Sequence, residues 1–208
     1  MKINESGRSM IEMLGVLAII GVLSVGGIAG YSKAMSKYRV NKTIDQISHI
    51  AANTRILFSS QKNYNDLGNS TNATIIYKAK LFPQEMKNTD GNYYNPFSGT
   101  VTMVAAQRFN GESDNKAFVV TYNGIPLEAC IDLATIDWGT GSGGGLVALG
   151  VNTAVDTMTT NGNSEDGDEC TSTDNSVVCG GNAVMDVDNA VNACKKNGDN
   201  SFLSFKFY

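Results

Sequence analysis

The sequence has a single histidine, His49, only three prolines and one tryptophan, and charged residues make up 17% of its 208 positions. With one histidine, there is no second imidazole for a metal site. The sequence also gives no support for a Ser-His-Asp or Cys-His catalytic arrangement. The formal net charge of −4 gives no electrostatic footprint for nucleic acid. We therefore expect no catalytic residue, no cofactor and no nucleic-acid partner, although a secreted or membrane-tethered ligand-binding domain stays open.

Two loop sequences resemble ligand sites only superficially. The glycine run at residues 139–145 lacks the P-loop and dinucleotide spacings, and no lysine follows it. The acidic stretch at residues 161–175 fails as an EF-hand loop, because its sixth position is Asp166 where the sharp turn requires glycine. Both are expected to be solvated surface loops without a metal.

The four cysteines lie beyond the N-terminal apolar segment; they are Cys130, Cys170, Cys179 and Cys194. An even number of cysteines in an exported domain usually indicates two disulfides and an oxidising compartment. Four cysteines allow three pairings. A zinc site that uses all four thiolates is the alternative, although the sequence contains no C-x2-C spacing.

An apolar segment without any charge, residues 13–32, dominates the N-terminal region. Twenty helical residues at 1.5 Å each span about 30 Å, the thickness of the hydrocarbon core of a bilayer. Glu12 immediately precedes the segment, where a lone carboxylate costs free energy in an apolar medium. The segment therefore predicts a helix that can span a membrane. The presence of the Glu12 carboxylate at its start needs an explanation.

Three interpretations compete for this segment. A cleaved secretory signal would have Lys2 and Arg8 as its basic region and a small-x-small cut at residues 27–29, but its apolar run exceeds the usual length. A plain single-span anchor conflicts with the charge bias, because four cations (Lys33, Lys37, Arg39 and Lys42) follow the span and only two precede it. If the cysteines require an oxidising space, the positive-rich side lies outside the cytoplasm.

The third interpretation rests on residues 7–14, Gly-Arg-Ser-Met-Ile-Glu-Met-Leu. They resemble the class III signal of type IV pilins and pseudopilins, in which prepilin peptidase cuts after a glycine and the new N-terminus is methylated. The resemblance implies cleavage after Gly7, Arg8 as the first mature residue and Glu12 as the fifth. Residues 20–24, Ile-Gly-Val-Leu-Ser, are similar to type IVb pilins, although the leader here is shorter than theirs and Arg8 is charged.

A physical argument supports a role for Glu12 in assembly. Cleavage after Gly7 would create an ammonium at Arg8, about 6 Å along a helix from Glu12. If neighbouring helices stack with a similar axial stagger, Glu12 of one subunit meets the terminal amine of another and no isolated charge remains in the apolar core. The alternative is that Glu12 lies at the membrane interface as an acid favoured by the helix dipole. Small residues would allow close helix packing; they are Gly15, Gly21, Gly26 and Gly30.

The helix is expected to continue beyond the apolar segment. Residues 33–61 contain no glycine or proline, and apolar positions recur at spacings of three and four. This periodicity predicts a helix to about residue 60 that packs one face on a sheet. The face comprises Ile44, Ile47, Ala51, Thr54 and either Leu57 or Phe58. His49 is expected at the surface or the edge of this face.

Turn and alternation signals predict the elements of the remaining chain. A polar loop is expected at residues 63–72, a short helix or strand at 75–82, a strong turn at 95–99, and strands at 101–105 and 118–122, with Asn123-Gly124 after the second. Pro126 and Asp186 each begin a predicted helix. Their buried faces are expected to be Leu127, Cys130, Ile131 and Ala134 in the first, and Val187, Ala190, Val191 and Cys194 in the second. Residues 146–151 look like a strand, and the alternation at 203–207 predicts a half-buried strand that belongs inside a sheet.

The resemblance to type IV pilins implies an α+β fold with a long N-terminal helix packed on an antiparallel sheet. It divides the chain into a leader (1–7), the transmembrane or filament-core half of the helix (8–32), its amphipathic half (33–62) and a globular α/β head (63–208). It also implies a disulfide between Cys130 and Cys194 that bounds the variable region 130–194. Cys170 and Cys179 would then close a short local loop.

The resemblance further implies a structural subunit of a type IV pilus, nearest to the type IVb major pilins, that polymerises into a helical filament for adhesion or aggregation. A minor pilin or a pseudopilin of type II secretion is the alternative. The implied partners are further copies of the chain, prepilin peptidase and the pilus assembly platform. The implied location is the bacterial inner membrane for the precursor and then an extracellular pilus.

Overall fold

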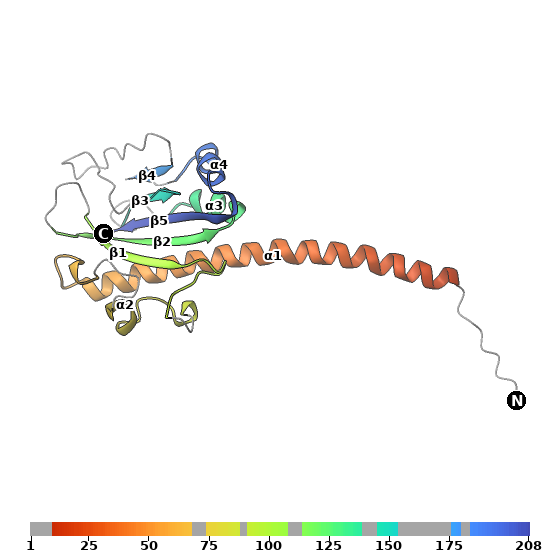
Figure 1. Ribbon diagram of the computed structural model, residues 1–208, viewed down its shortest axis with the longest axis horizontal. Coiled ribbons are helices and arrows are strands. Elements are labelled where there is room, and N and C mark those ends of the chain that lie inside the picture. The colour runs from red at the N-terminus through yellow and green to blue at the C-terminus, as the bar shows by residue number, and fades with distance from the viewer. Residues whose placement is uncertain are drawn as a thin grey trace, which may run out of the picture. The chain divides into compact units, whose positions relative to one another are not determined.

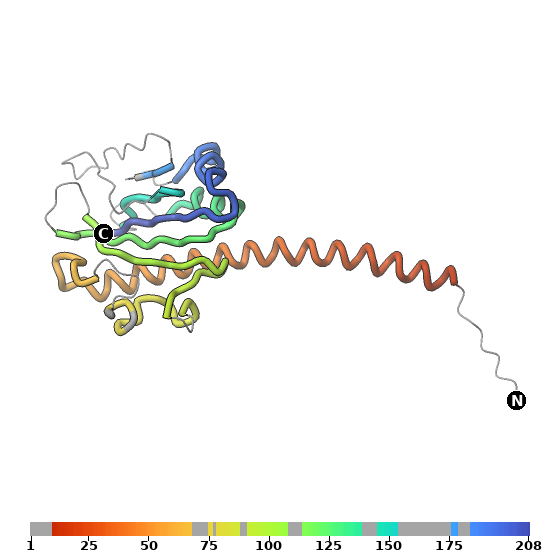
Figure 2. Tube along the Cα trace, in the orientation of Figure 1, coloured from red at the N-terminus to blue at the C-terminus, as the bar shows by residue number. Residues whose placement is uncertain are grey.

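The computed structural model describes residues 10–67, 74–87, 91–107, 114–138, 145–153, 176–179 and 184–208 (Figures 1 and 2). The chain divides into two compact units, Met1–Tyr38 and Arg39–Tyr208. Helix α1, Met10–Phe58, contributes residues to both units. The helix predicted to reach about residue 60 therefore ends close to its predicted position.

The second unit contains a five-stranded antiparallel sheet. Its strands are β1 (Val101–Ala106), β2 (Ala117–Ile125), β3 (Leu146–Val151), β4 (Val177–Cys179) and β5 (Ser201–Phe207). Their order is β1-β2-β5-β3-β4, and every neighbouring pair is antiparallel. Figure 2 shows β5, the last strand in the sequence, between β2 and β3. The α+β class is confirmed, and the strands predicted at 101–105, 118–122 and 146–151 are present.

Helices pack on the face of the sheet that carries Phe205 and Phe207 of β5. The guanidinium carbon of Arg55 in α1 lies 5.5 Å from the centroid of the Phe207 ring. Trp138, which follows α3 (Leu127–Ala134), lies 4.9 Å from the Phe205 ring, centroid to centroid. Helix α4 (Val187–Lys195) joins the same core through Ala190, Ala193 and Cys194. One continuous apolar core therefore unites α1, α3, α4 and the sheet.

The predicted apolar face of α1 is largely confirmed. Its fully or nearly fully buried members are Ile47, Ala51, Thr54 and Phe58, and Ile44 is half-buried. Ile50, which was not predicted, is also buried. Leu57 is 43% exposed, so Phe58 completes the face. His49 is exposed, as predicted.

Strand β5 is buried on both faces, so the expectation of a half-buried strand is wrong. Ser204 and Lys206, the polar members of the alternation, are each only 1% exposed. The reason is the central position of β5, since strands flank it on both sides and its second face adjoins a further buried cluster. That cluster comprises Ala106, Ala117, Val119, Ala148 and Val177.

Strand β2 continues through Asn123-Gly124, which the sequence had placed after the strand. The register between β2 and β5 shifts between Tyr122 and Ile125, and Gly124 has φ +66°. A local irregularity of this kind adds a bend to a strand without ending it. The Asn-Gly pair therefore marks a bulge within β2.

The predicted turn at residues 95–99 is confirmed. The amide of Ser98 donates to the carbonyl of Asn95 at 2.9 Å, and the Asn95 side-chain oxygen accepts from the amides of Phe97 and Gly99 at 2.8 and 3.1 Å. The side-chain nitrogen of Asn95 donates to the carbonyl of Asn123 at 2.7 Å. A Cβ atom at Gly99 would overlap that carbonyl. Only glycine fits there because the turn lies directly against β2.

Smaller elements complete the second unit. A 3-10 helix, η1 (Asn65–Leu67), lies within the predicted polar loop, and α2 (Thr74–Lys78) resolves the helix-or-strand alternative in favour of a helix. The remaining ones are η2 (Gln84–Met86) and η4 (Gly198–Asn200). Strand β4 had no sequence prediction, and the acidic loop at 161–175 lies outside the described residues.

The buried faces of α3 and α4 differ in detail from the predicted ones. In α3, Cys130 and Ala134 are buried, but Leu127 and Ile131 are only half-buried. In α4, Val187 is 58% exposed, so its assignment to the buried face is wrong. Val187 is the first helical residue. Ala193, which was not among the predicted residues, is buried.

Candidate functional site

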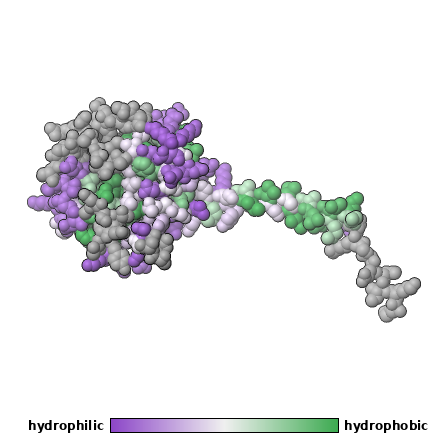
Figure 3. All heavy atoms as spheres, viewed as in Figure 1, coloured by the Kyte–Doolittle hydropathy of each residue, from purple (hydrophilic) through white to green (hydrophobic). Residues whose placement is uncertain are grey.

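The part of α1 that belongs to the first unit exposes large apolar side chains along its length, and Figure 3 shows one face of this surface. Its most apolar window of 18 residues has a mean hydropathy of 2.2, and none of that window is buried. Within the described residues, α1 is the one helix long and apolar enough to cross a membrane. Its large exposed residues include Ile11, Leu14, Leu17, Ile20, Leu23 and Ile28. An apolar surface this continuous requires a cover that the single chain does not provide.

Glu12 lies in the first turn of α1 and is exposed. The next acidic residue along the helix is Asp45, so Glu12 is alone among the apolar residues. A carboxylate in a first helical turn is favoured by the helix dipole. Gly7 and Arg8, which flank the predicted cleavage site, lie outside the described residues. Arg8 is also the predicted assembly partner of Glu12. The pairing of Glu12 with a terminal amine therefore stays a prediction.

The glycines singled out for helix packing lie within regular α-helix. A Cβ atom built on Gly15, Gly21, Gly26 or Gly30 meets nothing within 4 Å. No contact within the described chain requires glycine at these positions. A packing role for them would therefore involve another molecule.

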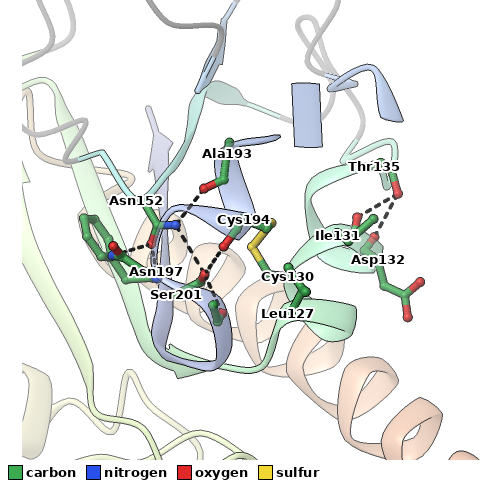
Figure 4. Close-up of a disulfide and its surroundings, with 12 residues drawn as sticks. Leu127, Cys130, Ile131, Asp132, Thr135, Asn152, Ala193, Cys194, Asn197 and Ser201 are labelled. Carbon is green, nitrogen blue, oxygen red and sulfur yellow. Dashed lines mark hydrogen bonds between the residues drawn. A yellow bond between two sulfur atoms is a disulfide. The ribbon is translucent and has the colours of Figure 1, made fainter. Parts of the chain in front are cut away.

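The disulfide between Cys130 and Cys194 joins α3 to α4 (Figure 4). The two Cα atoms are 6.0 Å apart, the residues are 64 positions apart in sequence, and both side chains are completely buried. This pairing was implied by the pilin resemblance and is confirmed. It also eliminates a zinc site built from four free thiolates. Cys170 lies outside the described residues, so its pairing with Cys179 stays a prediction.

Asn152, which follows β3, is the central polar residue beside the disulfide (Figure 4). Its Nδ2 donates to the carbonyl of Ala193 at 2.8 Å and to Ser201 Oγ at 3.2 Å, and its Oδ1 accepts from the amide of Phe202 at 2.9 Å. Ser201 Oγ in turn donates to the carbonyl of Cys194 at 3.0 Å. These bonds fix the segment between the end of α4 and the start of β5.

Sequence inspection did not identify this role of Asn152. The residue has φ +54°, a left-handed conformation that asparagine tolerates better than most residues. An asparagine directly after a predicted strand was therefore the available signal. The partners of its amide could not be predicted because they come from segments more than 40 positions away.

The described residues contain no cluster of metal-ligating side chains. No group of three or more His, Cys, Asp or Glu side chains in the described ranges could hold a metal ion. Burial raises the pKa of Tyr122 far above its ordinary value, and burial also raises the pKa of Tyr64 despite the opposing effect of Arg55. Both tyrosines belong to the packed core between α1 and the sheet, so their shifts reflect burial in the fold.

The comparisons with known proteins agree with this arrangement. The sequence model of the family described as PilS N terminal matches residues 37–205, well over half of the chain. The chain is 28% identical over 166 residues to the major structural subunit of bundle-forming pilus from Escherichia coli O111:H-, covering 78% of this chain and 79% of that protein. It is 26% identical over 139 residues to the toxin coregulated pilin of Vibrio cholerae serotype O1, covering 64% and 58%.

Among solved structures, a type IV b pilin from Salmonella typhi aligns with a TM-score of 0.49 and 16% identity over 77% of this chain and 95% of that one. Because the family match extends over most of the second unit and the end of the first, the chain belongs to the PilS N-terminal family of type IV pilins.

Proposed function

We propose that this chain is the major structural subunit of a type IVb pilus. The observation that carries the proposal is the uncovered apolar surface of α1, with Glu12 in its first turn, in a chain of the pilin family. The names of two relatives, a major structural pilus subunit and a pilin, support it. The proposed role of the chain is structural, because its copies polymerise into a filament.

The proposed life of the subunit has two stages. Before assembly, residues 13–32 span the inner membrane and the disulfide-containing head lies on the oxidising side. Prepilin peptidase removes residues 1–7, so that Arg8 begins the mature chain, and the pilus assembly platform receives the subunit. After assembly, residues 8–32 form the filament core, residues 33–62 support the head, and residues 63–208 are displayed with the variable region 130–194 on the surface.

The chemistry of the core explains why Glu12 is suited to this transfer. In lipid, the carboxylate lies near an interface, where it can stay hydrated. In the filament core, the same carboxylate would be unpaired unless another subunit supplies a cation, and the terminal ammonium at Arg8 is the proposed one. Gly15, Gly21, Gly26 and Gly30 would allow neighbouring helices to approach closely.

The substitution Glu12→Gln tests this proposal because it removes the charge and keeps the shape. We expect normal cleavage after Gly7, normal membrane insertion and a strong loss of surface filaments seen by electron microscopy. Glu5→Gln is the matched control, since residue 5 leaves with the leader and should not affect assembly. Wild-type numbers of filaments from the Glu12→Gln variant would contradict the proposed pairing.

A further inference from the structure

A band of tyrosines and lysines follows the apolar segment of α1 within the first unit. Tyr31 and Tyr38 are 67% and 58% exposed, and Lys33 and Lys37 between them are also exposed. These four residues are called the collar below. Tyrosine and lysine are the side chains that anchor a helix at a membrane interface, because each combines an apolar body with a polar end.

The charge around the collar is one-sided. No Asp or Glu occurs between Glu12 and Asp45, whereas Lys33, Lys37, Arg39 and Lys42 all fall in that interval. The chain as a whole is acidic, with a net charge of −4, so this concentration of cations departs from its average composition. A local positive charge beside an apolar span is complementary to an anionic membrane surface.

The two lysines of the collar fit within a headgroup layer. Four helical steps separate Lys33 from Lys37, which corresponds to about 6 Å along the axis, and the tyrosines extend the collar to about 10.5 Å. The headgroup region on each side of a bilayer is about 5–8 Å thick. At 100° per residue, Tyr31 and Tyr38 lie on nearly the same side of the helix, and Lys33 and Lys37 lie on the other side. The collar therefore surrounds the helix at the depth where lipid phosphates would lie.

The positive charge of the collar is not what the membrane topology of the chain would predict. The disulfide between Cys130 and Cys194 requires an oxidising compartment, so the residues after the span lie outside the cytoplasm. The positive-inside rule favours the opposite side for a lysine-rich flank. Topology therefore does not explain the cations that follow the span. Binding of an anionic ligand on the outer side of the membrane would explain them.

We propose that the collar binds the phosphates of anionic phospholipids in the outer leaflet of the inner membrane and thereby fixes the depth of the subunit before assembly. Lys33 and Lys37 supply ammonium groups, and Tyr31 and Tyr38 supply phenol groups at the interface. This inference rests on the proposed function in one respect, since it requires a membrane-inserted precursor.

The test uses the full-length chain reconstituted in phosphatidylcholine vesicles that contain 30% phosphatidylglycerol (about the anionic content needed for a marked surface potential). Trace spin-labelled phosphatidylglycerol or phosphatidylcholine reports, by electron paramagnetic resonance, the fraction of each lipid immobilised at the protein. We expect the wild-type protein to immobilise more phosphatidylglycerol, and the Lys33→Gln/Lys37→Gln variant to lose about half or more of that preference. The matched control, Lys62→Gln/Lys78→Gln, changes two exposed lysines of the second unit and should keep it.

The outcomes separate the two proposals. Flotation of the vesicles after an alkaline wash, which removes surface-bound protein, first shows whether the chain inserts; failure to insert would refute the membrane stage of the proposed function. Insertion without a preference for phosphatidylglycerol would overturn the collar alone. A Lys33→Gln/Lys37→Gln variant that keeps the lipid preference but forms fewer filaments would also overturn it, because the lysines would then bind an acidic surface of a neighbouring subunit.

Discussion

Arg55 in the last turn of α1 donates a hydrogen bond from Nε to the carbonyl oxygen of Tyr208 at 2.9 Å. Its guanidinium also lies over the ring of Phe207, and a Cβ atom at Gly145 would overlap it. The amide of Tyr208 donates to the carbonyl of Gly145 at 3.1 Å. One side chain therefore connects α1, the end of β5 and the start of β3.

Replacing Arg55 by alanine should destabilise the second unit. The change removes a hydrogen bond from a charged donor and a cation–π contact, which together correspond to about 2 kcal/mol. Urea unfolding of the full chain in detergent, followed by circular dichroism, measures the loss. Lys42→Ala is the control, because it removes an exposed ion pair with Glu85 at 3.6 Å and should cost about 0–1 kcal/mol. Equal effects of the two substitutions would contradict the role of Arg55.

Replacing Asn95 by alanine should loosen the turn at residues 95–99. Asn95 is 5% exposed and its side chain makes three hydrogen bonds, one of them to the carbonyl of Asn123 in β2. Leaving buried partners unsatisfied costs about 1–3 kcal/mol. Asn123→Ala makes a suitable comparison, since among the described residues that side chain bonds only to Thr100, at an exposed site. A smaller loss of stability for Asn95→Ala than for Asn123→Ala would show that the turn does not depend on its first residue.

Local patterns predicted much of this fold, and tertiary context decided the rest. The periodicity of Ile47, Ala51 and Thr54 identified the buried face of α1 because a helix repeats its contacts every turn. The alternation at residues 203–207 identified a strand inside the sheet, but not the burial of both its faces, which depends on the neighbouring strands and on the second buried cluster. Lys206 is buried despite its charge, an outcome that no local pattern predicts.

The candidate site shows the same division. The sequence around Glu12 identified the N-terminal segment because its motif is local and specific, and the pilin resemblance supplied the pairing of Cys130 with Cys194. The contacts of Asn152 could not be predicted, since they depend on how β3, α4 and β5 meet. The burial of Val187 was misjudged for a similar reason, because the exposure of this first residue of α4 depends on tertiary packing.

Removing the disulfide should cost more stability than either polar substitution. The Cys130→Ser/Cys194→Ser variant opens a loop whose ends are 64 positions apart, which corresponds to about 4 kcal/mol in the chain-entropy model. Urea unfolding with and without a reductant checks this value. A reductant should lower the stability of the wild-type protein by more than that of the double variant, because only the predicted bond between Cys170 and Cys179 is left to reduce in the variant. Equal stability of the reduced and oxidised wild-type protein would contradict the prediction.

Tyr122→Phe should leave stability unchanged or raise it. Tyr122 is completely buried, and its hydroxyl has no hydrogen-bond partner among the described residues. Removing a buried polar group without a partner eliminates its desolvation cost. Thermal unfolding at neutral pH measures the effect, and a loss of more than about 1 kcal/mol would indicate a partner for the hydroxyl.

The same substitution should alter the response to alkali. Burial raises the pKa of Tyr122 above its ordinary value of 10.0, so the folded state retains the proton that the unfolded state releases. The associated stability is fully present below about pH 10 and decreases as the pH rises further. Tyr122→Phe should therefore show a shallower decline in unfolding free energy above pH 10 than the wild-type protein. Identical slopes for the two proteins would contradict the raised pKa of Tyr122 in the folded state.

The most direct test of the pilus proposal is mass spectrometry of filaments sheared from cells that produce the protein. The account predicts that this chain is the main component of those filaments and that its N-terminal peptide begins at Arg8. A trace amount in filaments built mainly of another subunit would indicate a minor pilin. Recovery of the chain only in membranes, still starting at Met1, would contradict the account.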